Sequence, residues 1–232
     1  MNDLLQGDTA LITGAASGIG RGIALALAHE GVGVVLSDNN AVNGQRVADD
    51  LNATGAQASF LHADLSSADG AERLIRETIS RLGQLSILVH SASPKREENQ
   101  TADTVTDEQW LAMTNVNLTS GFKLGRAAAQ HMRDNKIAGR ILFITSLHAD
   151  TPRNLPHYSA SKAGTTMVMK ELARAYGPHG IRVNAIAPGA IPGGGFSADP
   201  ATLIDKIALG RVGTPEDIGN AAVALLSNRF SA

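Results

Sequence analysis

Tyr158 and Lys162 have the residue types and the spacing that proton transfer needs. They are four residues apart in the segment Tyr158-Ser159-Ala160-Ser161-Lys162, so on a helix their side chains share one face. A free tyrosine has a pKa of about 10, and an ammonium about 4 Å away would stabilise its phenolate by roughly 4 kcal/mol at an effective dielectric constant of about 20. The pair could therefore serve as a general acid and base near neutral pH, although such pairs also occur on solvated helix faces.

A glycine-rich turn, Thr13-Gly14-Ala15-Ala16-Ser17-Gly18-Ile19-Gly20, lies between an expected strand and an expected helix. Glycines permit unusual φ angles and let the backbone approach a pyrophosphate closely. The free N–H groups at the start of the helix attract phosphates. We therefore expect a dinucleotide here, and the alternative is a strand–helix turn that binds no ligand. The expected contacts are Gly14, Ser17, Gly18, Ile19 and Gly20.

Asp38 ends the second expected strand, at the separation from the glycines that suits a ribose-binding acid. A carboxylate there accepts hydrogen bonds from the adenosine ribose and repels a 2′-phosphate. Neither Asn39 nor Asn40 is basic, and Ala15 and Ala16 place no cation in the turn. This charge pattern favours NAD over NADP, unless Asp38 is only a solvated strand end.

Asp64 and Leu65 follow the third expected strand. Both are candidates for the adenine side of the same dinucleotide site, where the Asp64 carboxylate could meet the adenine amino group. The alternative is that Asp64 is the N-cap of a helix that begins near Ala68.

Short apolar runs alternate with longer amphipathic stretches along the whole chain. The expected strands are 10–12, 33–37, 58–61, 85–89, 140–145 and 181–186, and the expected helices are 21–30, 43–54, 68–82, one or more within 106–133, 158–176 and 215–226. This alternation predicts an α/β fold with one doubly wound, Rossmann-like parallel sheet and helices on both faces. The Pro/Gly-rich piece 188–195 follows a strand, so we expect a binding loop there and a single domain over 1–232.

The composition is that of an ordinary soluble protein: 232 residues, 43% hydrophobic, 18% charged, with a formal net charge of -2. The near-neutral charge gives no reason to expect nucleic acid or a membrane surface as partner. The chain has no cysteine, which excludes disulfides and thiolate metal ligands, and without paired histidines we expect no metal site. No secretory signal or membrane span is visible, so a cytoplasmic protein is the default expectation.

Taken together, these features resemble the short-chain dehydrogenase/reductase family in its shorter, NAD-using form. The resemblance runs from about Thr9 to Ser227. It rests on the glycine-rich turn, Asn117 in Asn115-Val116-Asn117-Leu118, Ser146 after the fifth strand, Tyr158 with Lys162, Pro188-Gly189 after the sixth strand, and the late segment Gly210-Arg211-Val212-Gly213-Thr214-Pro215-Glu216-Asp217-Ile218.

The resemblance implies a role for each site residue. Tyr158 would be the general acid in ketone reduction and the general base in alcohol oxidation, while Lys162 lowers its pKa and binds the nicotinamide ribose. Ser146 would hydrogen-bond the substrate oxygen, and Asn117 would hold a water that links Lys162 to solvent. The cofactor would also be bordered by Ser91, Ala92, Pro188, Gly189 and Ile191.

The chain departs from the family pattern in three places. The stretch His90-Ser91-Ala92-Ser93 replaces the usual Asn-Asn-Ala-Gly, which puts the ribose contact near Ser91 in doubt. Gly193, within Pro192-Gly193-Gly194-Gly195, stands where a carboxamide-binding Thr is common, and we expect a mobile loop. After the last helix the sequence stops at Ala232, without the further strand and tail usual in the family; truncation, an omitted tail and an incomplete sequence remain open.

The expected function is NAD-dependent oxidation of an alcohol or polyol, or reduction of a carbonyl compound. Polar candidates for the substrate pocket (Ser93, Arg153 and Asn154 among them) favour sugars or polyols. His148 and His157 flank the site, where we expect surface loop histidines rather than substrate contacts. The alternatives are a 3-oxoacyl thioester reductase using NADP and a non-catalytic dinucleotide-binding regulatory protein. The resemblance also implies a homodimer or homotetramer built on 106–133 and 158–176.

Overall fold

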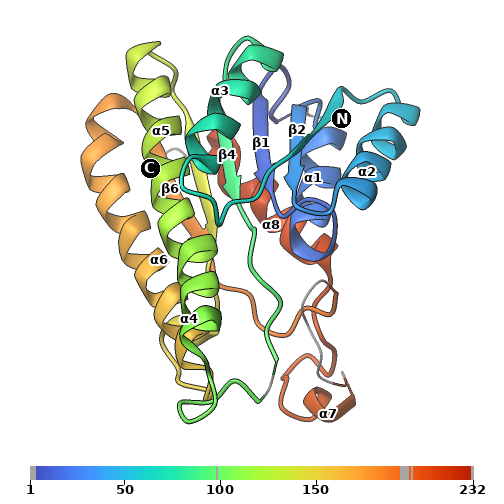
Figure 1. Cartoon of the computed structure of the whole chain (residues 1–232). Coiled ribbons are helices and arrows are strands. Elements are labelled where there is room, and N and C mark those ends of the chain that lie inside the picture. Colours follow the sequence, from blue (N-terminus) through green and yellow to red (C-terminus); the bar gives the residue numbers. More distant parts are fainter. Residues whose placement is uncertain (1–3, 98, 194–198, 200, 231–232) are drawn as a thin grey trace.

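Six parallel strands form one sheet in the order β3-β2-β1-β4-β5-β6 (Figure 1). The computed structural model describes residues 4–97, 99–193, 199 and 201–230. The strands are β1 (Thr9–Thr13), β2 (Gly33–Asp38), β3 (Ala58–His62), β4 (Ile87–His90), β5 (Arg140–Ile144) and β6 (Arg182–Ile186). The expected doubly wound parallel sheet is confirmed, and each expected strand is present to within about two residues.

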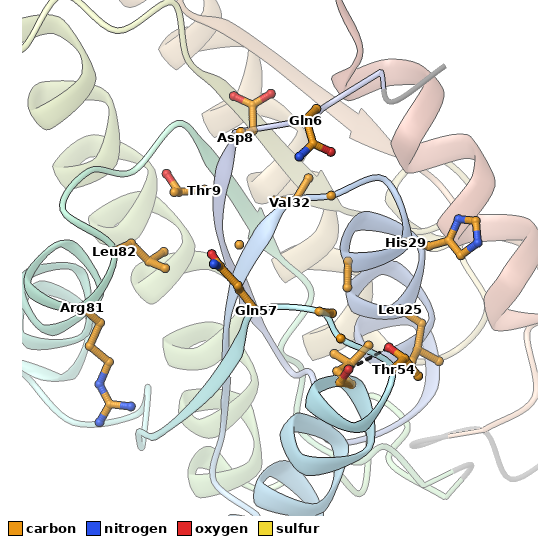
Figure 2. Close-up of a pocket in the computed structure, with 17 residues that line it drawn as sticks. Gln6, Asp8, Thr9, Leu25, His29, Val32, Thr54, Gln57, Arg81 and Leu82 are labelled. Carbon is orange, nitrogen blue, oxygen red and sulfur yellow. Dashed lines mark hydrogen bonds between the residues drawn. The ribbon is translucent and has the colours of Figure 1, made fainter. Parts of the chain in front are cut away.

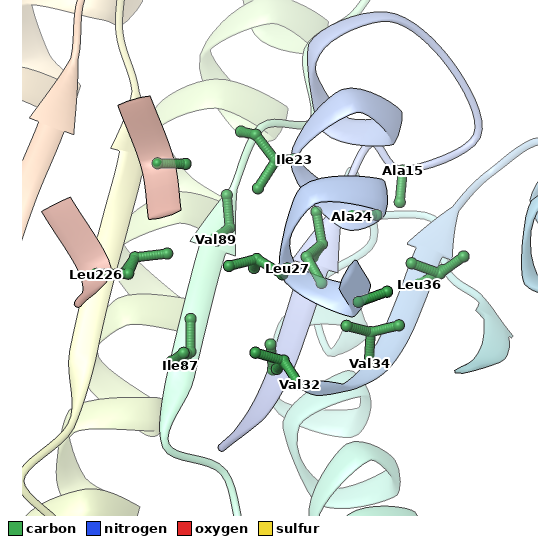
Figure 3. Close-up of a cluster of buried hydrophobic side chains, with 14 of the residues drawn as sticks. Ala15, Ile23, Ala24, Leu27, Val32, Val34, Leu36, Ile87, Val89 and Leu226 are labelled. Carbon is green, nitrogen blue, oxygen red and sulfur yellow. The ribbon is translucent and has the colours of Figure 1, made fainter. Parts of the chain in front are cut away.

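Helices cover both faces of this sheet. They are α1 (Gly18–His29), α2 (Ala41–Ala53), α3 (Gly70–Leu82), α4 (Asp107–Thr114), α5 (Ser120–Asp134), α6 (Pro156–Tyr176), the short α7 (Ala201–Ile204) and α8 (Pro215–Leu226). One apolar cluster joins α1, α2 and α8 to one face, and a second joins α3, α5 and α6 to the other. Figure 3 shows the first cluster, in which Ile23 and Leu27 of α1 pack on Val34, Ile87 and Val89 of the strands.

The region expected to hold one or more helices within 106–133 contains a helix with a change of winding in the middle. A capping box, in which Thr106 and Gln109 each accept a backbone N–H from the other, starts α4. The chain then passes through a π-helical turn, η1 (Asn115–Thr119), directly into α5. Such insertions are rare in helices and often lie at functional sites. Here the π-turn contains Asn117.

Glycines let α1 and α8 approach each other closely. A Cβ on Gly22 of α1 would collide with the backbone carbonyl of Pro215, and one on Gly219 of α8 would lie 2.7 Å from the Gly22 oxygen. Pro215 stands at the first turn of α8, which Thr214 caps. The late segment shared with the family therefore fixes α8 against the helix that follows the glycine-rich turn.

A hollow of about 820 Å³ lies at the amino ends of β1 and β2, and Figure 2 shows Gln6, Asp8, Gln57 and Arg81 around it. Ligands of doubly wound sheets bind at the opposite edge, beyond the carboxyl ends of the strands. The residues with the chemistry of interest lie at that opposite edge, so this hollow has no part in the site. No helix in the described part of the chain is long and apolar enough to cross a membrane.

Candidate active site and dinucleotide site

The turn after β1 and the loop after β4 meet where the strand order reverses direction. This is the point at which doubly wound sheets bind nucleotides. Gly14 has φ +68°, and a Cβ on it would lie 2.8 Å from the Cα of Ala92. A Cβ on Gly20 would collide with the carbonyl oxygen of Gly14. Both positions therefore require glycine, because their backbones touch other backbone.

The first turn of α1 has free N–H groups that can hold an anion. Ser17 is the N-cap in extended conformation, and its side chain makes no capping hydrogen bond within the described part of the chain. Gly18 follows with φ +51°, and Ile19 packs against the core beneath it. Backbone N–H groups at the start of a helix carry partial positive charge. The local geometry therefore leaves these N–H groups available to an anion, while the phosphate contact itself stays a prediction. We call this glycine-rich turn with the start of α1 the cradle.

Asp38 places its carboxylate against the glycine-rich turn. One oxygen accepts the Ala16 N–H at 3.1 Å and the other accepts the Asn40 N–H at 2.9 Å. Each carboxylate oxygen can accept a further hydrogen bond. The end of β2 thus presents a negative charge and free acceptor capacity beside the cradle.

Asp64 is not the N-cap of the next helix, which begins at Gly70 with Asp69 as its N-cap. The Asp64 carboxylate instead accepts the Ser66 N–H at 2.9 Å and the Ser66 hydroxyl at 2.7 Å, and these bonds lower its pKa. Its side chain is exposed beside the buried Leu65. The helix-cap alternative is therefore wrong, and the adenine contact stays a prediction.

Tyr158 and Lys162 share the inner face of α6, whose first turn is preset by Pro156. Both are buried, with 7% and 4% of their surface exposed. The Lys162 ammonium lies 5.5 Å from the centroid of the Tyr158 ring and donates to the Ile144 carbonyl at 2.8 Å. Burial lowers the pKa of Lys162, and the nearby Tyr158 raises it in part.

The pKa of Tyr158 is the outcome of opposing effects. Burial raises it, but the positive charges of Lys162 and Arg96, with hydrogen bonds to Ser146 and Arg96, outweigh burial. The pKa of the phenol therefore lies below its ordinary value. A phenol with this bias can give up and regain a proton closer to neutral pH than free tyrosine.

Ser146 and Asn117 approach the same face of α6. Ser146 follows β5, lies near enough to Tyr158 to lower its pKa, and accepts the His148 N–H at 3.2 Å. Asn117 donates its side-chain amide to Ser161 at 2.9 Å, while its buried Oδ1 has no partner among the described residues. An unpartnered buried acceptor fits an ordered water. The Thr145 hydroxyl donates to the Ile186 carbonyl at 3.1 Å, so this side chain points into the sheet.

His90 replaces the usual asparagine and forms a bridge that the sequence did not suggest. Its Nε2 lies 3.2 Å from the Asn117 carbonyl, and its Nδ1 lies 3.0 Å from the Thr13 hydroxyl. A carbonyl only accepts, so Nε2 carries the proton and the Thr13 hydroxyl donates to Nδ1. The Thr13 oxygen also accepts the N–H groups of Ser91 and Ala92. One chain of hydrogen bonds thus joins both loops of the cradle to the π-turn.

The His90 ring is buried and fits only because its neighbour is small. A Cβ on Gly121 would lie 3.0 Å from the ring's Cδ2. Burial, with a smaller effect of the Lys162 charge, lowers the pKa of His90 to about 4. The ring is therefore neutral at pH 7, as the bridge requires.

Arg96 is a second residue that sequence reasoning missed. It lies in the loop after β4, and its guanidinium carbon is 4.6 Å from the centroid of the Tyr158 ring. No spacing rule links a loop residue to a helix 62 positions later in the sequence, and only the folded sheet brings them together.

The two histidines beside the site are not surface loop residues as expected. His157 is fully buried in the first turn of α6 and contacts the Gln100 side chain at 3.2 Å. His148 is half-buried in a short 3-10 turn, and its ring meets that of Tyr158 edge-on at 5.1 Å. The expectation failed because His157 belongs to α6 and meets Gln100 of the loop after β4, while the 3-10 turn holds His148 against Tyr158.

The loop after β6 approaches the cradle from the other side. Pro188 is buried, and its carbonyl accepts the Leu147 N–H at 3.4 Å, while Ile191 packs on the core below α1. Gly189 is exposed, and a Cβ on Gly193 would lie 3.5 Å from the Cα of Gly18. Gly194 and Gly195, expected in a mobile loop, lie outside the described residues, as does the end at Ala232.

The comparisons with known proteins agree with this arrangement. A family model described as enoyl-(acyl carrier protein) reductase matches residues 14–232. The chain belongs to the short-chain dehydrogenase/reductase family. A 3beta-hydroxysteroid dehydrogenase of Eggerthella lenta is 35% identical over 100% of this chain and 91% of its own length. Glucose 1-dehydrogenase 2 of Bacillus subtilis is 32% identical over 98% and 90%.

A crystal structure from Beutenbergia cavernae, described as an NAD(P)-dependent gluconate 5-dehydrogenase with NADP bound at low occupancy, superimposes with a TM-score of 0.92. It is 31% identical, and the alignment covers 100% of this chain and 94% of that one. These relatives show that the chain is an oxidoreductase of this family that acts on CH–OH groups. The family's cofactor is a nicotinamide dinucleotide.

The His90 bridge makes stability depend on pH. The ring has a pKa of about 4 in the folded chain and about 6.5 when unfolded. The unfolded chain binds more protons between these values, so this stabilisation is complete above about pH 6.5 and is lost as the pH falls toward 4. The free energy of unfolding, measured by urea titration, should fall between pH 7 and pH 5. The fall should be about 2 kcal/mol larger in the native chain than in His90→Asn, which has no imidazole to titrate.

His90→Gln serves as the matched control, since its amide can reach Asn117 but does not titrate. It should show the same reduced pH dependence as His90→Asn. Equal pH slopes for all three proteins would contradict the neutral buried imidazole.

Proposed function

We propose that this chain is an NAD-dependent alcohol dehydrogenase or carbonyl reductase of its family, with the whole chain as one catalytic domain. The observation that carries the proposal is Tyr158, buried beside Lys162 and near Ser146, at the edge of the sheet where the cradle lies. Bound there, the nicotinamide supplies or accepts the hydride. The protein's residues hold it and manage the proton.

The residues present fit a dinucleotide. The pyrophosphate would lie on the free N–H groups around Ser17, Gly18 and Gly20, where a Cβ has no room at Gly14 or Gly20. Asp38 would take the adenosine ribose, with Asp64 and Leu65 near the adenine. Ser91 and Ala92 on one side, and Pro188, Gly189 and Ile191 on the other, would border the remainder.

The proton route follows from the hydrogen bonds around α6. In reduction, the Tyr158 hydroxyl gives its proton to the substrate oxygen, which Ser146 also holds. The phenolate that remains is stabilised by the Lys162 ammonium, itself oriented by the Ile144 carbonyl. A water on the unpartnered Oδ1 of Asn117 would connect this centre onward. In oxidation the same steps run backwards.

The substrate we propose is a sugar, polyol or other small hydroxyl compound. His148 and Arg96 beside Tyr158 make its surroundings polar, and a relative acts on glucose. A 3-oxoacyl thioester reductase would usually need NADP, against which Asp38 argues. A non-catalytic regulator would gain nothing from burying the Lys162 charge, which costs folding energy.

We also propose a homo-oligomer formed through α4, α5 and α6. These helices expose large apolar side chains to solvent: Trp110, Leu111, Phe122 and Met167. Exposed apolar residues that gather on neighbouring elements commonly mark an interface. Light scattering after size exclusion should give a dimer or tetramer mass, and a monomer at micromolar concentration would contradict the proposal.

Tyr158→Phe removes the hydroxyl and keeps the ring. We expect kcat for a responsive alcohol to fall by about 10²-fold to 10⁴-fold, because the proton then has no donor or acceptor. NADH absorbance measures the rate, and quenching of Trp110 fluorescence by NADH can show that cofactor still binds. Undiminished turnover would exclude Tyr158 as the acid/base.

Asp38→Ser should change which cofactor is preferred. Without the carboxylate a 2′-phosphate is no longer repelled and the ribose loses a charged acceptor, so the NAD/NADP ratio of kcat/KM should drop about tenfold or more. Asp50→Ser on the exposed face of α2 makes the same charge change away from the site and should leave the ratio unchanged. A native preference for NADP would refute the NAD assignment.

A further inference from the structure

Arg96 stands over the residue that we propose moves the proton. Its guanidinium carbon is 4.6 Å from the Tyr158 ring centroid, within the range of a cation–π contact. Arg96 is only half-exposed, so its position is set by the surrounding chain and not by solvent alone. A substrate whose carbon reacts at Tyr158 and Ser146 must therefore lie close to this guanidinium.

A second arginine supports the first. Arg153 is an exposed residue of the loop between the 3-10 turn at 147–149 and α6, and its charge acts on His148, whose ring meets that of Tyr158. Burial and the charges of both arginines lower the pKa of the intervening His148 to about 4. His148 therefore contributes no charge at neutral pH, and the electrostatics near the Tyr158 hydroxyl come from cations.

In the described part of the chain, no carboxylate is paired with Arg96 or Arg153. The neighbouring acids Glu97 and Asp150 are both exposed, and Glu98 lies outside the described residues. Lys162 adds a third, buried positive charge on the inner side of Tyr158.

We propose that Arg96, assisted by Arg153, forms an anion subsite beside Tyr158, and that the substrate is a hydroxy or keto compound carrying a carboxylate or phosphate close to its reacting carbon. This rests on the proposed function, since it names the substrate class of the same site. A guanidinium offers paired N–H donors that match the oxygens of either anion. A neutral polyol would offer these arginines no charged partner.

The test compares substrates matched in carbon skeleton and differing in charge. Suitable probes are gluconate against glucitol, 3-hydroxybutyrate against 2-butanol, and glycerol 3-phosphate against glycerol, with NAD and NADH absorbance. We expect kcat/KM for an anionic member to exceed that of its neutral partner by about tenfold to a hundredfold. The carboxylate and phosphate arms then identify which anion the subsite takes.

Arginine variants separate anion binding from an effect of Arg96 on the phenol. Arg96→Gln would change the pH profile for every substrate, so the informative quantity is the ratio of anionic to neutral kcat/KM. We expect Arg96→Gln and Arg153→Gln each to reduce this ratio about tenfold, mainly through KM of the anion. Lys95→Gln, an equal charge change at an exposed neighbour in the same loop, should leave the ratio unchanged.

Two results would overturn the subsite: a preference for the neutral member in all three pairs, or the same anion/neutral ratio in Arg96→Gln as in the native chain. Calorimetry with succinate, which has no alcohol to oxidise, provides a readout without turnover. Binding that Arg96→Gln weakens supports the subsite even if no alcohol is oxidised, in which case only the proposed reaction fails. If succinate binds the native chain no better than Arg96→Gln, the subsite itself is wrong.

Discussion

The neutral imidazole of His90 connects the two halves of the site. Its two nitrogens link the Thr13 hydroxyl at the end of β1 to the Asn117 carbonyl in the π-turn. Through Thr13, the bridge also orders the N–H groups of Ser91 and Ala92, against which Gly14 packs. The cradle and the face of α6 that carries Tyr158 and Lys162 are thus positioned by one buried ring that must remain uncharged.

The chemistry near Tyr158 depends on a balance between burial and charge. Burial alone would raise the pKa of the phenol, and it lowers that of Lys162. The balance lowers the pKa of the phenol because two cations face the ring from different elements, Lys162 from its own helix and Arg96 from the loop after β4. Without the folded sheet that brings this loop over α6, only the lysine would remain.

The sequence predicted the features that depend on local pattern. The apolar runs located all six strands, the four-residue spacing placed Tyr158 and Lys162 on one helix face, and the glycines marked turns with positive φ at Gly14 and Gly18. Each of these follows from chain geometry over a few residues, which is why a single sequence suffices.

Features that depend on distant contacts could not be predicted. His157 is buried in α6 against Gln100, 57 positions away in the sequence. Asp64 is a local exception, because a carboxylate after a strand can cap a helix or accept the N–H two residues on, and the sequence does not decide between the two. The π-turn at Asn115–Thr119 has no signature in apolar spacing. The partners of His90 and Arg96 are 27 and 62 positions away in the sequence, beyond the range of any local rule.

The space that Gly121 leaves for the His90 ring has an evolutionary consequence. A methyl group at that position would meet the imidazole at 3.0 Å, tighter than side chains normally tolerate, and an asparagine at position 90 would withdraw from it. A lineage could therefore exchange the histidine for the usual asparagine and then lose the glycine, whereas losing the glycine first would strain the bridge. A descendant of this chain that keeps His90 should therefore also keep Gly121.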